Sequence, residues 1–178
     1  MLLGNFGLTF SVIPSNIEEF FPDRIINLQQ FVSNLALEKA RAVAKTKKGI
    51  VLGADTVVVL GKKVLGKPAD AEDAKRMLRM LSGKTHKVIT GVGIADTIDN
   101  KVYKLHETTL VTFRKIDKKE IHFYVQSGSP FDKAGAYGIQ DDFGSTFISK
   151  INGDYFNVVG LPIVKTYLAL KKALGIRI

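Results

Sequence analysis

The chain has 178 residues, and its 46% of apolar and 24% of charged residues are typical of a globular protein rather than a disordered or fibrous one. It contains no cysteine, which excludes disulfide bonds, a thiol nucleophile and a cysteine-based zinc site, and fits a reducing compartment. The formal net charge of +9 favours anionic partners, but it does not distinguish nucleotides from nucleic acid or an anionic lipid surface.

Helical and strand patterns alternate along the chain, which indicates an α/β or α+β layer fold without internal repeats. Asn27, Asp70 and Asp117 stand where helix N-caps are expected, and Glu120 completes a capping box with Asp117. In chain order, we predict a strand at 8–14, a loop at 20–26, a helix at 27–45, a strand at 50–60, a short strand through Val64 and Leu65, a helix at 70–81, strands at 88–95 and 102–113, a helix at 117–125, a loop at 133–138, a strand at 147–150 and a helix from Pro162.

We expect one cytoplasmic domain over residues 1–178 that does not enter a membrane. No apolar stretch approaches the roughly 18 residues that a helix needs to span a bilayer. The first basic residue is Arg24, so the N-terminus lacks the positive region of a secretory signal.

Two charged residues interrupt apolar patterns. Asp55 lies inside the run at 50–60, where a buried carboxylate must be paired, bound to a metal or protonated. The alternative is a structural aspartate that accepts hydrogen bonds from nearby amides. Lys39 lies four residues after Leu35 and four before Val43, on the apolar stripe of its helix. Its ammonium group either reaches along the stripe to solvent or points into a cleft.

Two glycine-containing segments are candidate phosphate contacts. Residues 61–68 match seven positions of the pattern GxxxxGK[ST], but Pro68 lacks the hydroxyl and the N–H that a true phosphate loop uses. Lys67 could still reach a phosphate from the end of the hairpin, or it could belong to a basic hairpin tip. The segment 133–140 is dense in small residues, which lets its backbone approach a ligand, and Gln140 supplies a donor and an acceptor. This segment could equally be a tight connection.

Other motifs are incomplete. His86, His106 and His122 are too far apart for a helical metal pair, and a lone histidine is more often structural. Residues 91–93 begin a dinucleotide-binding pattern, but Asp96 replaces its third glycine and the context is a strand.

Several short sequence strings, taken together, are specific to one protein family. In this order, the chain resembles the Maf family of nucleotide pyrophosphatases at 53–58 (GADTVV), 65–68 (LGKP), 81–86 (LSGKTH), 90–92 (TGV), 133–140 (KAGAYGIQ) and 158–162 (VVGLP). The resemblance implies an α/β fold of the inosine-triphosphatase-like type, with a long mixed sheet flanked by helices and two lobes around a central cleft. It also implies hydrolysis of a nucleoside triphosphate to monophosphate and pyrophosphate with Mg²⁺ or Mn²⁺, and a homodimer. The first and fifth strings look like the branch that prefers dTTP and UTP.

The resemblance also implies site residues. Asp55 matches an aspartate that binds the metal and activates the attacking water. Glu19 matches an acidic residue of the family, which we expect to hold this metal and to take part in binding the substrate. Lys39 and Lys67 match lysines that neutralise phosphate. Gln140 matches a glutamine that contacts the phosphate or the base.

One family feature is missing. Family members begin with a strand and a Ser-x-Ser-Pro-Arg-Arg signature, whereas no Pro-Arg-Arg string occurs in this chain. We therefore expect an N-terminally truncated domain, in which Met1 is an internal methionine or a misassigned start. Two non-catalytic alternatives remain: a nucleotide binder that cannot cleave, and a nucleic-acid binder that uses the positive charge. The 9% of aromatic residues and the absence of tryptophan disfavour the latter.

Overall fold

The computed structural model describes residues 2–18, 27–140 and 143–175. The chain divides into two compact units, which agrees with the two lobes of the expected fold. The first unit comprises 1–55, 90–107 and 160–178, and the second comprises 56–89 and 108–159.

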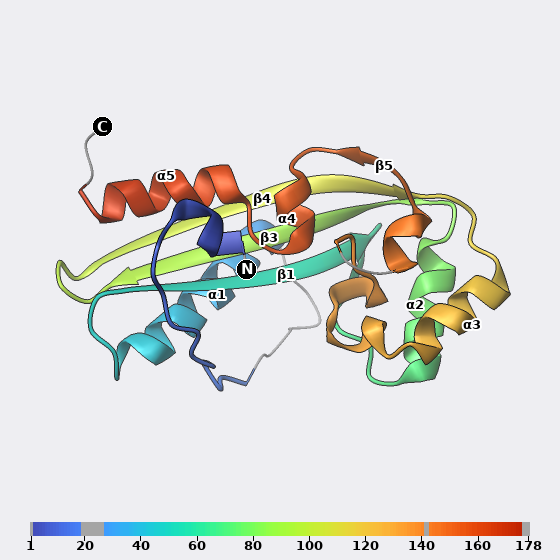
Figure 1. The fold of residues 1–178 in the computed structure, drawn as a ribbon, viewed down its shortest axis with the longest axis horizontal. Coiled ribbons are helices and arrows are strands. Elements are labelled where there is room, and N and C mark those ends of the chain that lie inside the picture. The colour runs from blue at the N-terminus through green and yellow to red at the C-terminus, as the bar shows by residue number, and fades with distance from the viewer. Residues whose placement is uncertain (1, 19–26, 141–142, 176–178) are drawn as a thin grey trace. The chain divides into compact units, whose positions relative to one another are not determined.

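A five-stranded sheet contributes to both units (Figure 1). The strands, in the spatial order β2-β1-β3-β4-β5, are β1 (Ile50–Leu60), β2 (Lys63–Leu65), β3 (Thr85–Asp96), β4 (Lys101–Phe113) and β5 (Ile148–Asn152). The short β2 pairs antiparallel with the end of β1, and β5 pairs antiparallel with the end of β4. Figure 1 also shows β3 running opposite to β1 and β4. The α/β class is confirmed, and the sheet, expected to be mixed, is antiparallel in the described residues.

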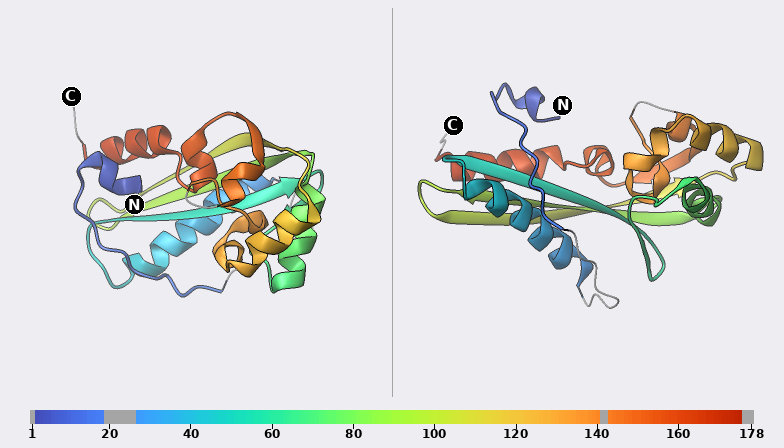
Figure 2. Two further views of the ribbon diagram at one scale, coloured as in Figure 1. Left: turned by 45° about the vertical axis from the view of Figure 1, so that its right-hand side comes forward. Right: turned by 90° about the horizontal axis from the view of Figure 1, so that it is seen from below.

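The first unit packs helices on both faces of β3. Its elements are η1 (Leu2–Phe6), α1 (Leu28–Ala44) and α5 (Ile163–Ala173). The side chain of Asn27 accepts a hydrogen bond from the Gln30 backbone N–H at 3.0 Å and so caps α1 as predicted. Val92 and Ile94 form a core with Leu170 of α5, whereas the alternate residues of β3 face α1. Figure 2 shows these two helices on different sides of the strands.

The second unit packs helices and short helical turns around one apolar core. Its helices are α2 (Ala71–Leu81), α3 (Lys118–Gln126), η2 (Ser129–Asp132), η3 (Ala134–Ala136), η4 (Phe143–Phe147) and α4 (Tyr155–Val159). Asp70 caps α2, and Asp117 with Glu120 forms the predicted capping box of α3. The largest fully buried side chains of this core are Tyr124, Phe113, Phe147, Leu78 and Leu81. Among the described residues, no helix of either unit is both long and apolar enough to span a bilayer.

The structure also differs from the sequence-based expectations in one strand and one short helix. The predicted strand at 8–14 is wrong, because this segment forms no strand and Leu8, Phe10 and Val12 remain exposed. Its alternating pattern favours a strand, but a strand also needs a neighbour with which to pair. The short helix α4 was not predicted. The loop expected at 20–26 lies outside the described residues.

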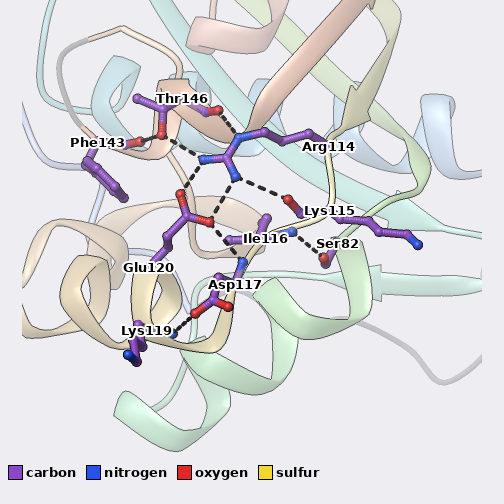
Figure 3. A network of polar contacts seen from close by, with 9 residues as sticks. All are labelled: Ser82, Arg114, Lys115, Ile116, Asp117, Lys119, Glu120, Phe143 and Thr146. Carbon is purple, nitrogen blue, oxygen red and sulfur yellow. Dashed lines mark hydrogen bonds and ion pairs between the residues drawn. The ribbon is translucent and has the colours of Figure 1, made fainter.

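A polar network joins the end of β4 to the start of α3 (Figure 3). The Arg114 guanidinium donates two hydrogen bonds to the Glu120 carboxylate, at 2.6 and 2.9 Å, and a third to the Thr146 carbonyl at 2.7 Å. Glu120 also accepts from the Asp117 backbone N–H at 2.9 Å. The bonds from Arg114, followed by the one from Asp117, lower the pKa of Glu120 to about 2.

We expect Glu120→Gln to lower the free energy of unfolding by about 1–2 kcal/mol at neutral pH, since glutamine keeps the shape but loses the charge. The low pKa of Glu120 makes this contribution complete above the unfolded value of 4.5, and it is lost as pH falls towards 2. The free energies of unfolding of the two chains, measured with urea, should therefore converge in acid. Glu72→Gln, in an exposed pair with Lys75, is the matched control and should change little. A constant difference down to pH of about 2 would contradict the assignment.

Candidate active site

A buried ion pair joins α1 to β1 in the first unit. The Lys39 Nζ lies 2.6 Å from the Asp55 Oδ1, and the two side chains are 18% and 8% exposed. The ammonium group of Lys39 is therefore directed inward at a carboxylate. Of the possibilities that the sequence left open for Asp55, the described residues show a paired carboxylate.

Three strand glycines let α1 lie directly on the sheet. A Cβ on Gly53 would meet the Ala36 carbonyl oxygen at 2.3 Å, and a Cβ on Gly93 would meet the Leu37 backbone nitrogen at 2.3 Å. Gly91 would clash with α1 in the same way, at 2.5 Å. Gly53 and Asp55 are two residues apart and share one face of β1, so the Asp55 side chain also faces α1. These glycines thus set the depth at which Lys39 meets Asp55.

The sequence carries a signal for this contact at residues 91–93, where two glycines that begin an incomplete dinucleotide pattern stand inside a strand. Glycine inside a strand often marks a place where another backbone approaches closely. The helix that approaches here lies more than 50 positions earlier in the chain, and only the fold identifies it.

A pocket of about 610 Å³ lies beside the ion pair and within the first unit. Lys39 and Val43, four residues apart on one face of α1, line it together with Lys47 from the segment after that helix. Five consecutive residues of β1, 50–54, form another wall. Lys48 adds a further ammonium group. This wall of lysines suits an anionic ligand, and the volume is in the range of small-molecule sites.

The described residues offer one of the two predicted metal ligands. Asp55 supplies a carboxylate oxygen, which is the type of donor that Mg²⁺ prefers, while Glu19 lies outside the described residues. Within the described part of the chain, no group of three or more His, Asp and Glu side chains could hold a metal ion. Protein Mg²⁺ sites commonly use one or two carboxylates together with substrate phosphates and water. The donor set therefore fits a metal that is completed by its substrate.

The second unit brings together the two glycine-containing segments. The Gly135 backbone N–H donates to the Gly66 carbonyl at 2.9 Å, which places the segment 133–140 beside the loop that carries Lys67. Lys67 and Gln140 are both exposed. Gly135 approaches Val58 of β1 so closely that a Cβ would lie 2.9 Å from it. The small residues here serve close packing, and the two polar side chains remain accessible.

Sequence reasoning missed a buried polar contact behind this segment. His86 of β3 is 2% exposed, and its Nε2 lies 2.8 Å from the hydroxyl of Tyr137, which is 5% exposed. Phe113 packs edge-on against both rings, with centroid distances of 5.0 and 4.7 Å. Burial lowers the pKa of His86 to about 4, so the imidazole is neutral at physiological pH.

This burial predicts a pH-dependent stability. Between pH 6.5 and about 4 the unfolded chain binds a proton at His86 that the folded chain does not. The contribution of this group to the free energy of unfolding is therefore fully present above pH 6.5 and falls as pH decreases. We expect the free energy of unfolding to fall by about 2 kcal/mol from this source between about pH 7.5 and pH 5. Urea titrations of the wild type and His86→Phe isolate this part, because all other groups titrate in both. Parallel pH profiles would contradict it.

Comparison with known proteins identifies the family. The family model described as Maf-like protein matches residues 1–173. The chain belongs to the Maf-like protein family. This Maf-like chain is 46% identical over 179 residues to a dTTP/UTP pyrophosphatase of Thermoanaerobacter sp. (strain X514), covering 99% of the chain and 92% of that relative. It is 50% identical over 178 residues to the dTTP/UTP pyrophosphatase of Escherichia coli O157:H7, covering 99% and 88% respectively.

A solved structure is also similar. It is a nucleoside-triphosphatase / dITP/XTP pyrophosphatase from Mycobacterium abscessus ATCC 19977 / DSM 44196, with a TM-score of 0.40 and 12% identity. The similarity covers 89% of this Maf-like chain and 78% of that chain.

Proposed function

We propose that this Maf-like chain is a nucleoside triphosphate pyrophosphatase that converts dTTP and UTP to the monophosphate and pyrophosphate. The observation that carries the proposal is the buried Lys39–Asp55 pair beside a lysine-lined pocket, in a chain of this family. Support for the substrates comes from relatives named dTTP/UTP pyrophosphatase that align with 99% of the chain. No observation on the described residues favours a non-catalytic binder.

In the proposed reaction, water attacks the α-phosphorus, the bond from that phosphorus to the oxygen bridging the β-phosphate breaks, and pyrophosphate leaves. Asp55 accepts the proton of the attacking water. Lys39 orients the carboxylate and offsets negative charge on the phosphates. Burial strengthens both effects, because little water competes with the ammonium group for the carboxylate or screens its charge from the phosphates.

We propose that Asp55 holds Mg²⁺ or Mn²⁺ together with Glu19, and that this ion would supply further neutralisation of phosphate charge. Lys67 and Gln140 are proposed as phosphate contacts, with Gln140 also able to reach the base. Their exposure in the second unit supports a role in binding a ligand. A homodimer and a cytoplasmic location stay predictions.

Product analysis tests this function. The chain is incubated with dTTP, UTP, CTP, GTP or ATP and Mg²⁺ or Mn²⁺, in water enriched in ¹⁸O. We expect monophosphate and pyrophosphate from dTTP and UTP, with the label in the monophosphate because the α-phosphorus is attacked. Label in pyrophosphate, release of orthophosphate alone, or no product from any nucleotide would contradict the proposal.

A further inference from the structure

The contact between His86 and Tyr137 is unexplained by the proposed chemistry. It lies in the core of the second unit, and the residues are 51 positions apart. His86 ends the string at 81–86, to which the resemblance assigns no role.

Packing alone does not account for an imidazole at this position. Burial removes its hydration, and its Nδ1 has no hydrogen-bond partner among the described residues. A phenyl ring would fill the same space against Phe113 and Tyr137 without that cost. What the imidazole adds is the 2.8 Å hydrogen bond between its Nε2 and the Tyr137 hydroxyl, which fixes the orientation of that ring.

Tyr137 follows a backbone turn that needs external support. Gly135 and Ala136 both have positive φ angles, of 70° and 61°. A non-glycine residue rarely adopts this left-handed conformation, and it persists where the surrounding structure imposes it. Tyr137 is the first residue after the turn and is buried, so its anchored ring holds the turn from one side.

The turn is connected in both directions to the proposed ligand contacts. Before Tyr137, the Gly135 N–H donates to the Gly66 carbonyl, which precedes Lys67 directly. After Tyr137, the Gly138 N–H donates to the Tyr124 hydroxyl at 3.1 Å, two residues before Gln140.

We infer that His86 is a positioning residue: through the hydroxyl of Tyr137 it fixes the turn at 133–140 and thereby the places of Lys67 and Gln140. His86 itself touches no substrate. The effect on the nucleotide rests on the proposed function, in which Lys67 and Gln140 contact it. The effect on the backbone does not.

The test compares His86→Phe, Tyr137→Phe and the double variant, all made in the full chain. Each removes one end of the same hydrogen bond and keeps a ring of similar size. We expect the KM for dTTP to rise about tenfold in each, with kcat within about twofold, because ground-state and transition-state contacts weaken together. The double variant should be no worse than either single variant, since the bond is lost only once.

A purely structural role gives a different result. It would reduce apparent kcat with the folded fraction and leave KM unchanged. His122→Asn, which alters an exposed histidine on α3, is the matched control and should change neither constant. An unchanged KM in both single variants, or effects that multiply in the double variant, would overturn the inference.

Backbone hydrogen exchange separates this inference from the proposed function. In His86→Phe, the amides of Gly135 and Gly138 should exchange about tenfold faster than in the wild type. If the wild type hydrolyses no nucleotide, the proposed function fails, and exchange alone decides the role of His86. Unchanged exchange at both amides would overturn that role whatever the activity.

Discussion

Replacing Asp55 by asparagine is expected to lower kcat for dTTP by about 10³-fold or more, because the amide keeps the shape of the carboxylate but cannot take a proton from water. The side chain is 8% exposed, so solvent does not readily replace the lost base. The chain should remain folded, since Lys39 is 18% exposed and its ammonium group can gain hydration. Steady-state kinetics and circular dichroism on the same preparation check both statements.

Asp96→Asn is the matched control for this experiment. Asp96 is a second buried aspartate of the first unit, 6% exposed, and it accepts hydrogen bonds from the backbone N–H groups of Ile98 and Asp99. It holds a turn and does not line the lysine-lined pocket, so the kcat of Asp96→Asn should stay within about threefold of the wild type. If Asp55→Asn kept more than about a tenth of the activity, Asp55 would not be the proton acceptor.

The features that could be predicted from the sequence are those set by residues close together in the chain. Asn27, Asp70 and Asp117 cap the helices that they were expected to cap, because an N-cap bonds an amide only two or three residues away. Asp55 and Lys39 were identified because each interrupts an apolar pattern. A charge in such a position must find a partner, and the structure shows that each is a partner of the other.

Contacts between distant residues could not be predicted in the same way. The segment 8–14 has the pattern of a strand, but pairing depends on an edge that the pattern does not specify. His86 was one of three isolated histidines, and nothing near it in the sequence indicates Tyr137. The roles of Lys67 and Gln140 stay predictions, because exposure shows that they are accessible and not what they bind.

The second large effect that we expect is a loss of both stability and activity on substitution of a glycine under α1. Gly53→Ala would place a Cβ 2.3 Å from the Ala36 carbonyl oxygen and 2.9 Å from the Ala40 backbone nitrogen. Both atoms belong to helix backbone, so a side-chain rotation cannot relieve the clash and α1 must move. We expect the free energy of unfolding to fall by about 3 kcal/mol. Because Lys39 moves with the helix, kcat should also fall by about 10²-fold. Urea unfolding and dTTP kinetics measure the two losses.

Gly4→Ala is the control for the loss of a glycine, since a Cβ there would meet nothing within 4 Å. Gly93→Ala then tests whether displacement of α1 alone, without a change in the strand that carries Asp55, lowers the activity. It would press on Leu37 of α1 at 2.3 Å, from a strand that does not carry Asp55. If α1 moves as a rigid body, Gly53→Ala and Gly93→Ala should lose activity together, because either shift withdraws Lys39 from the same carboxylate. Full activity in a destabilised Gly53→Ala chain would instead mean that the 2.6 Å approach of Lys39 to Asp55 contributes stability but not rate.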